Sequence, residues 1–343
     1  MNLFIKCGGI ISLKVTLFSV TFILSQPHLS SQTEGKMEAE NYTITREFIL
    51  LGLTSHPKKR LLLFVTVLLI YLLTIFGNTL IIILVWADSQ LHTPMYFFLG
   101  HLAGMEIGYV TSTLPQMLIH LLTGNRVISL VCCTLQGYMT LAMGSTECLL
   151  LGAMAYDRYL AICHPLVYAL TMDRYHQFLL ATSCWTIGFV FSAIYVLCTF
   201  RHPFCGIVIN HFICEPPAVL KLACGDTRIT KVIGFGLSSF IVLVPLFVIL
   251  TSYGYILDSV LHMRSTGGWH KAFSTCGSHL AVVTLFYGTI ISMYIVPQSS
   301  SASDRNKKIA VFYLVITPLL NPIIYTLRNK DIHLAALKML KRL

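Results

Sequence analysis

An acidic and a basic residue stand side by side at the end of a long apolar stretch, within Met154-Ala155-Tyr156-Asp157-Arg158-Tyr159-Leu160-Ala161-Ile162-Cys163. Charged side chains are costly in hydrocarbon and are usually placed where they pair or meet water. The Asp157–Arg158 pair therefore indicates a membrane boundary, where a charge pair could act as a switch. The alternative is a polar helix end that only anchors the span among the lipid headgroups.

Two further acids lie inside apolar stretches. With a helical rise of about 1.5 Å per residue, Glu147 lies about 16 Å from Arg158, and Glu106 about 18 Å from Pro94. Both carboxyl groups are thus predicted near the bilayer centre, at similar depth. Two buried acids must share a proton, bind a cation or face water. Two separately hydrogen-bonded, protonated acids facing the bundle are the alternative.

These residues need membrane-spanning elements to position them. The chain has 343 residues, of which 55% are hydrophobic and 11% charged, against about 25% charged in soluble domains. The apolar runs lack the period-two alternation of a barrel, so we predict an all-α membrane protein, a seven-transmembrane helix bundle. Runs near the bilayer-crossing length of about 20 residues are Leu61–Trp86, Pro94–Leu122, Leu130–Leu160, Gln177–Leu197, Val232–Leu257, Ala272–Val296 and Ile309–Tyr325.

Charge and motif content argue against several classes of protein. The net charge is +10, but the basic residues are scattered and form no stripe with interleaved aromatics, so nucleic acid is not an expected partner. A transporter or channel for small solutes, the alternative function, would place charges in several spans and show repeat symmetry. A membrane enzyme would need a His/Asp cluster or a nucleophile elbow at membrane depth. The sequence has neither such a cluster nor a nucleophile elbow, so we expect no catalytic activity and no cofactor.

The Lys/Arg distribution over the loops does not fix the orientation, but two other signals place the N-terminus outside the cell. Asn41-Tyr42-Thr43 is a glycosylation sequon just before the first span. Four cysteines fall on the same side of the membrane, as disulfides in an oxidising space require. They are Cys133, Cys205, Cys214 and Cys224.

Six motifs in register carry a resemblance to one family. They are Phe76-Gly77-Asn78, Pro94-Met95-Tyr96-Phe97-Phe98-Leu99, Met154 to Pro165, Ser252-Tyr253, Lys271-Ala272-Phe273-Ser274-Thr275-Cys276 and Pro318-Leu319-Leu320-Asn321-Pro322-Ile323-Ile324-Tyr325. From about residue 40 to 335 the chain resembles a vertebrate odorant receptor of the tetrapod-type branch, a rhodopsin-like G-protein-coupled receptor. The resemblance implies a plasma-membrane protein that binds small volatile odorants and activates a stimulatory, olfactory-type G protein to raise cyclic AMP.

The resemblance also divides the chain. Residues 1–36 resemble a signal peptide, an uncleaved anchor or an upstream extension with Met37 as the effective start, and the third reading is favoured because the resemblance begins near Met37. Residues 37–60 are the expected extracellular N-terminus, 61–327 the receptor bundle and 328–343 a cytoplasmic tail. The tail alternates apolar and basic residues and predicts a short amphipathic helix on the inner leaflet. A disordered basic tail is the alternative.

The resemblance implies a switch at the cytoplasmic end. Asp157 would hold Arg158 in the off state, and Tyr253 and Tyr325 would accept it after the sixth helix moves outward to admit the Gα C-terminal helix. His279 could instead be a core histidine, and Pro322 a structural kink. The switch and coupling residues are Asp157, Arg158, Tyr159, Tyr253, Lys271, His279, Asn321, Pro322 and Tyr325. A sodium ion or water cluster is implied at Asn78, Glu106, Glu147 and Asn321.

Outside, the resemblance implies the disulfides Cys133–Cys214 and Cys205–Cys224, although four cysteines by themselves allow three pairings. A metal site in the run His211-Phe212-Ile213-Cys214-Glu215 is the alternative. It would need Cys214 as a thiolate, which a disulfide excludes.

The ligand pocket is expected in the outer half of the bundle. No acid lies in the outer half of the third span, so a protonated amine would lack an obvious counter-ion. Small, mostly hydrophobic molecules with one hydrogen-bonding group would suit the site, although any one lining residue could serve helix packing instead. The candidates, with Tyr294 foremost, are Thr140, Leu141, Gly144, Ser145, Leu237, Ser238, Ile241, Ile290, Tyr294, Val311 and Leu314.

Overall fold

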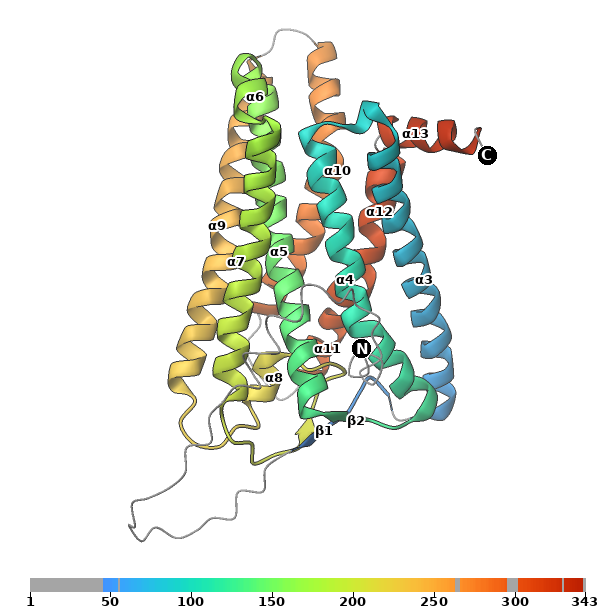
Figure 1. Cartoon of the computed structure of the whole chain (residues 1–343), viewed down its shortest axis with the longest axis vertical. Helices are drawn as coiled ribbons and strands as arrows, with labels where there is room; N and C mark the ends of the chain where they lie inside the picture. Colours follow the sequence, from blue (N-terminus) through green and yellow to red (C-terminus); the bar gives the residue numbers. More distant parts are fainter. Residues whose placement is uncertain (1–45, 55, 263–265, 295–301, 329, 342–343) are drawn as a thin grey trace.

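The computed structural model describes residues 46–54, 56–262, 266–294, 302–328 and 330–341. The leader 1–36 and the sequon at Asn41 lie outside these ranges. Within them, seven long helical segments run side by side (Figure 1), and the predicted bundle is confirmed. The segments are α3 (Pro57–Ala87), α4 (Pro94–Thr123), α5 (Leu130–Cys163), α7 (Arg174–Phe200), α9 (Arg228–Leu261), α10 (Thr266–Tyr294) and the succession α11 (Ala302–Val311), η2 (Phe312–Ile316) and α12 (Thr317–Arg328).

Local sequence sets where the helices begin and end. Proline, whose missing N–H costs nothing in a first turn, starts α3 and α4. The Ser129 side chain caps α5 by accepting from the Cys132 N–H at 3.2 Å. Asp173 caps α7 by accepting from the His176 N–H at 2.9 Å, and this backbone hydrogen bond lowers the pKa of the Asp173 carboxyl. Gly124, in the left-handed region at φ 75°, ends α4.

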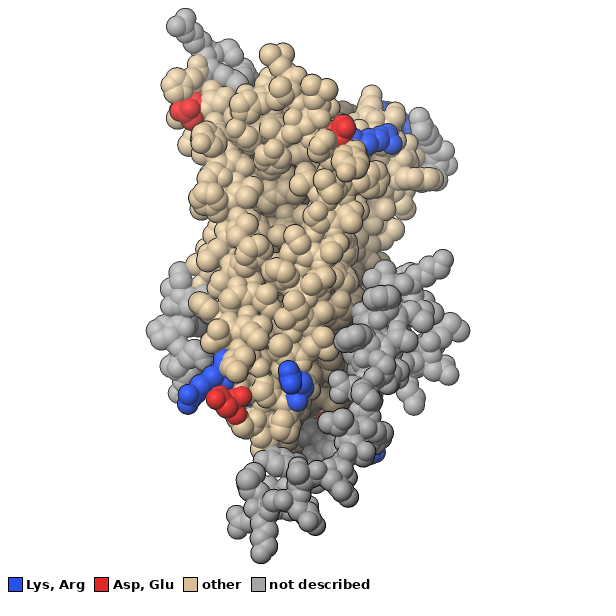
Figure 2. Space-filling model, turned by 60° about the vertical axis from the view of Figure 1, so that its left-hand side comes forward, with Lys and Arg blue, Asp and Glu red and all other residues tan. Residues whose placement is uncertain are grey.

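Helix α5 is the central helix of the bundle and packs against α4, α7 and α9. Among the described residues, α3, α7, α9 and the segment Lys307–Thr326 are long and apolar enough to cross a membrane. Helices α4 and α5 are of similar length, and their buried faces carry the acids Glu106, Glu147 and Asp157. Figure 2 shows the charged side chains of one face near the two ends, with an uncharged band between them. This is the surface expected of a multi-pass membrane protein.

A three-stranded sheet that the sequence did not predict closes one end of the bundle. Strand β1 (Glu47–Leu50) pairs antiparallel with β2 (Val127–Ser129) and parallel with β3 (Val208–Ile209). Phe48 and Leu50 are fully buried in a small core that includes Cys133 and Cys214. The segment before the first span is therefore packed onto the loops at this end.

The opposite end carries two short helices, α6 (Pro165–Thr171) and α13 (Lys330–Leu340), and α13 runs crosswise to the long helices at the edge of the bundle (Figure 1). The amphipathic tail helix predicted for 328–343 is thus present, with Ile332 buried and Leu334 exposed. The Tyr96 hydroxyl donates to Asp331 at 2.9 Å. The remaining short helices are η1 (Ser89–Leu91) and α8 (Pro216–Leu220).

Candidate functional site

A cavity of about 220 Å³ lies between α5, α7, α9 and α10, beneath the loop that carries α8. Its wall is mostly apolar, with hydroxyl groups from serine, threonine and tyrosine. Its lining residues are Tyr109, Gly137, Thr140, Leu141, Gly144, Ser145, Cys148, Phe191, Ser192, Tyr195, Glu215, Pro216, Pro217, Leu237, Ser238, Ile241, Val242, Phe286, Ile290 and Tyr313.

The structure brings most of the predicted pocket residues together around this cavity. Those that line it are Thr140, Leu141, Gly144, Ser145, Leu237, Ser238, Ile241 and Ile290. Two predicted positions do not: Leu314 is fully buried in the main core, and Val311 packs against that core. Their neighbour Tyr313 lines the cavity instead, because successive helical residues point in different directions. The side chain of Tyr294 lies outside the described residues.

Sequence reasoning missed the contributions of α4, α7 and the loop, among them Tyr109, Ser192 and Glu215. Glu215 corrects one prediction, because an acid does reach the cavity, although it comes from the loop rather than from the third span. The signal was available, since Glu215 directly follows the cysteine expected to bond Cys133.

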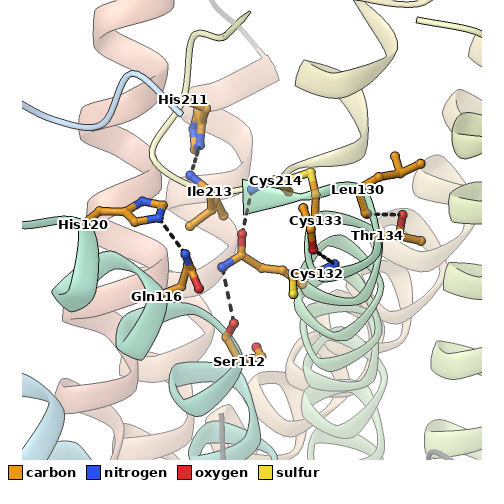
Figure 3. Close-up of a disulfide and its surroundings, with 12 residues drawn as sticks. Ser112, Gln116, His120, Leu130, Cys132, Cys133, Thr134, His211, Ile213 and Cys214 are labelled. Carbon is orange, nitrogen blue, oxygen red and sulfur yellow. Dashed lines mark hydrogen bonds between the residues drawn. A yellow bond between two sulfur atoms is a disulfide. The ribbon is translucent and has the colours of Figure 1, made fainter. Parts of the chain in front are cut away.

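The loop above the cavity is fixed to α5 by covalent and hydrogen bonds. Cys214 is disulfide-bonded to Cys133, with Cα atoms 5.3 Å apart (Figure 3). Its backbone N–H donates to Gln136 Oε1 at 2.9 Å. A Cβ added to Gly137 would lie 2.7 Å from the Cys214 carbonyl oxygen, so the loop approaches α5 closely. Cys205 and Cys224 form the second bridge.

Both implied disulfides are therefore present, and Cys214 is not available as a thiolate. The alternative metal site at His211, Cys214 and Glu215 is contradicted. In the described part of the chain, no group of three His, Cys, Asp or Glu residues could hold a metal ion.

The two mid-bundle acids meet an asparagine from the seventh helical segment. Glu106 and Glu147 are buried and interact with each other, and Asn321 Nδ2 donates to Glu106 Oε1. Three oxygens of these residues, Glu106 Oε2, Glu147 Oε1 and Asn321 Oδ1, have no hydrogen-bond partner among the described residues. Asn78 instead ties α3 to α12 by donating to the Pro318 carbonyl at 3.3 Å.

The charge pair lies at the opposite end of α5 from the disulfide. Arg158 Nη2 and Nε donate to Asp157 Oδ2 at 2.8 and 3.1 Å. The Tyr168 hydroxyl of α6 donates to Asp157 Oδ1 at 2.8 Å. Burial, then the neighbouring carboxylate, raises the pKa of Tyr168, so this phenol keeps its proton and remains a donor. Asp157 thus accepts from two partners at once.

The other predicted switch residues have separate partners. The Tyr253 hydroxyl and His279 Nδ1 are 2.6 Å apart, so His279 makes a specific polar contact. The Tyr159 hydroxyl pairs with His164 at 2.8 Å, and the Tyr325 hydroxyl is buried without a partner among the described residues.

Pro322 is also a packing residue, because a Cβ added to Gly77 would lie 3.1 Å from its Cβ. The side chain of Lys271 lies outside the described residues. Within the described residues, neither Tyr253 nor Tyr325 hydrogen-bonds to Arg158, whose guanidinium is bonded to Asp157.

Comparison with known proteins shows the family of this chain. A family model described as Olfactory receptor matches residues 67–342. Olfactory receptor 2W1 of Homo sapiens is 46% identical over 306 residues, covering 89% of this chain and 96% of that protein. Olfactory receptor 5P52 of Mus musculus is 48% identical over 307 residues, covering 89% and 99%. The bundle has a pocket at one end and a charge pair at the other, and the chain matches these proteins over most of its length. It therefore belongs to the olfactory receptor family, whose members are odorant-binding G-protein-coupled receptors and not enzymes.

Proposed function

We propose that the 220 Å³ cavity is the odorant site, and that its occupancy activates a stimulatory, olfactory-type G protein and raises cyclic AMP. The observation that carries this proposal is the position of the cavity, which contacts α5, α9, α10 and η2 at once. A ligand there touches the helices whose other ends carry Arg158, Tyr253 and Tyr325. Rearrangement of these helices is therefore coupled to ligand binding.

The lining supports small, mostly apolar ligands. Drug-sized pockets measure about 300–1,000 Å³, and this cavity is smaller. Ser145 and Ser192 face each other with their oxygens 3.5 Å apart, and Thr140 Oγ1 is buried without a hydrogen-bond partner among the described residues. These hydroxyls give a ligand polar contacts within an apolar wall.

The orientation follows from the two ends of the bundle. The end with the disulfides and the sheet belongs in an oxidising space, and the end with Asp157 and Arg158 faces the cytoplasm. We therefore assign the receptor to the plasma membrane with its N-terminus outside. Release of Arg158 from Asp157 would open the cytoplasmic end for the Gα subunit, with Lys271 at its edge.

A larger side chain at Gly144 tests the pocket. A Cβ there would lie 4.0 Å from the Tyr109 hydroxyl and meets nothing closer, so Gly144→Leu places its side chain in the cavity. Since overpacking costs about 1–3 kcal/mol, we expect the half-maximal concentration of activating volatiles to rise about tenfold or more. The measurement is cyclic AMP in cells with and without a stimulatory Gα, at matched surface expression.

Gly236→Leu is the matched control, because Gly236 is an exposed position on α9 with open space around it. Its dose–response curve should equal that of the parent receptor. Unchanged sensitivity of Gly144→Leu to every active volatile would show that ligands bind elsewhere. A response that persists without stimulatory Gα would contradict the proposed coupling.

We also propose that Glu106, Glu147 and Asn321 hold a sodium ion in the resting state. Their three unpartnered oxygens are the hard donors that such a cation prefers, and a bound cation would offset the burial of two acids. At a sodium concentration ten times the Kd, binding would add about 1.4 kcal/mol of stability. Thermal unfolding of purified receptor should shift upward in sodium chloride relative to choline chloride.

Glu147→Gln should remove this shift, because it takes away one of the two charges. An equal shift in Glu147→Gln, or none in the parent receptor, would favour the alternative of two protonated, separately bonded acids.

A further inference from the structure

Glu215 adds an acidic group to the cavity, which the lining residues on the long helices do not provide. It precedes α8, and its side chain is 17% exposed. Of the described residues that line the cavity, it is the one that carries a carboxyl group, and none of them is lysine or arginine. The roof of an otherwise apolar pocket is therefore acidic.

The acid retains acceptor capacity toward the cavity. The Tyr313 hydroxyl donates to Oε1, and Oε2 lies 3.8 Å from His211 Nε2, beyond hydrogen-bonding distance. His211 Nδ1 accepts from the Ile213 N–H at 3.3 Å, so the ring is held by the loop backbone. Oε2 therefore receives no hydrogen bond from His211, and a carboxylate has about four acceptor positions.

The remaining polar lining groups do not select for donors or acceptors. Thr140, Ser145, Ser192, Ser238 and the tyrosines present hydroxyls, and a hydroxyl can either donate or accept. An ionised carboxylate can only accept. Glu215 is therefore the lining group that decides whether a complementary head group must donate or accept a hydrogen bond.

We propose that Glu215 selects odorants whose head group donates a hydrogen bond, a hydroxyl or a protonated amine, and rejects carboxylic acids. This inference rests on the cavity being the odorant site. A donor head group would bind Oε2 by a charge-assisted hydrogen bond. An ionised acid would instead meet a like charge where little water screens it, and a ketone would supply no donor to Oε2.

The test uses straight-chain amines, alcohols, methyl ketones and carboxylic acids of equal length, about six to ten carbons to suit a small pocket. In the parent receptor, amines or alcohols should activate at about 10- to 100-fold lower concentration than the matched acids, the range expected for one charge-assisted hydrogen bond. If Glu215→Gln reduces the response to the amines alone, the preferred head group is the cation. If it reduces the response to both amines and alcohols, the selected feature is the donor.

Glu215→Gln keeps the shape and keeps an acceptor for Tyr313, but adds an N–H donor and removes the charge. It should reduce the preference for amines and alcohols over acids by about 10- to 100-fold, and it should improve the response to ketones and acids. Asp226→Asn is the matched control, because it removes an exposed carboxylate near the same end of the bundle that pairs with Arg228 at 3.7 Å, outside the cavity lining. It should leave the head-group order unchanged.

Three outcomes overturn the proposal. The first is that acids activate the parent receptor as strongly as alcohols and amines. The second is that Glu215→Gln lowers the responses to all four head groups equally at matched surface expression, as loss of a purely structural contact would. The third is that Glu215→Gln leaves the head-group order unchanged. Tyr313→Phe separates these roles, since it removes the contact but keeps the charge, and should preserve the head-group order. If Gly144→Leu shifts sensitivity while Glu215→Gln does not alter the order, the pocket stands and only this assignment fails.

Discussion

Replacing Arg158 with alanine is expected to abolish ligand-dependent cyclic AMP production. Arg158 lies at the end of α5 away from the cavity, and its guanidinium is held by Asp157, whose side chain is fully buried. In the proposed mechanism this guanidinium is released to complete the Gα-binding surface. Without it, a bound odorant has no group to free, so the expected loss is the whole signal.

The single variant also leaves a buried carboxylate without its cation, which costs about 3–5 kcal/mol. We therefore pair it with the double variant Asp157→Asn, Arg158→Ala. The asparagine oxygen still accepts from the Tyr168 hydroxyl, which now donates to Asp157 at 2.8 Å. The double variant should reach the surface yet remain silent.

Cyclic AMP and surface labelling, measured in the same cells, separate signalling from folding. Arg174→Ala is the control, because it removes an exposed arginine from the first residue of α7 at the same end of the bundle. It should signal normally. A ligand response in the double variant would contradict a role for Arg158 in activation.

Replacing Cys214 with serine is expected to prevent stable folding. The bond from Cys133 to Cys214 joins residues 81 apart in sequence, and in the chain-entropy treatment a loop of that length contributes about 4.5 kcal/mol. The same bond anchors the loop that roofs the cavity and the small core beneath β1, where Phe48 and Leu50 are buried. Few proteins have stability to spare beyond about 5–15 kcal/mol.

Surface labelling and thermal unfolding in detergent measure this effect, with strong loss of surface receptor and a lowered melting temperature expected. Cys198→Ser is the control, since Cys198 is a free, partly buried cysteine on α7, and it should change neither quantity. Wild-type surface levels with an unchanged melting temperature in Cys214→Ser would contradict the assigned role of the disulfide.

The spans were predictable because hydrocarbon leaves few choices. A segment that crosses the bilayer must be apolar, and its backbone must bond within itself, so composition alone located each helix. The ends were less accurate. Helix α3 begins at Pro57 rather than Leu61, and its first turn contains Lys58 and Lys59. Hydropathy assigns these charged residues to a loop, although helical hydrogen bonding continues into the headgroup region.

The edge sheet was not predictable by the same reasoning. Strands β1, β2 and β3 are 4, 3 and 2 residues long and come from segments more than 70 residues apart. Strands this short have no periodicity to detect, and their pairing depends on how distant loops pack at this end of the bundle. Glu215 reaches the cavity because it directly follows Cys214, which is disulfide-bonded to Cys133 on α5.

By itself the sequence determined the membrane class, the helical bundle, the disulfide cysteines and the part of the pocket wall that comes from α5 and α9, because these depend on residue type and on spacing along one helix. Tertiary structure alone decided which residue near the start of η2 faces the cavity, where Tyr313 and not Val311 or Leu314 is the lining residue. It also decided that an acid from the loop, Glu215, lines the cavity. Both depend on how distant segments pack against each other, and no local sequence pattern predicts the free energy of that packing.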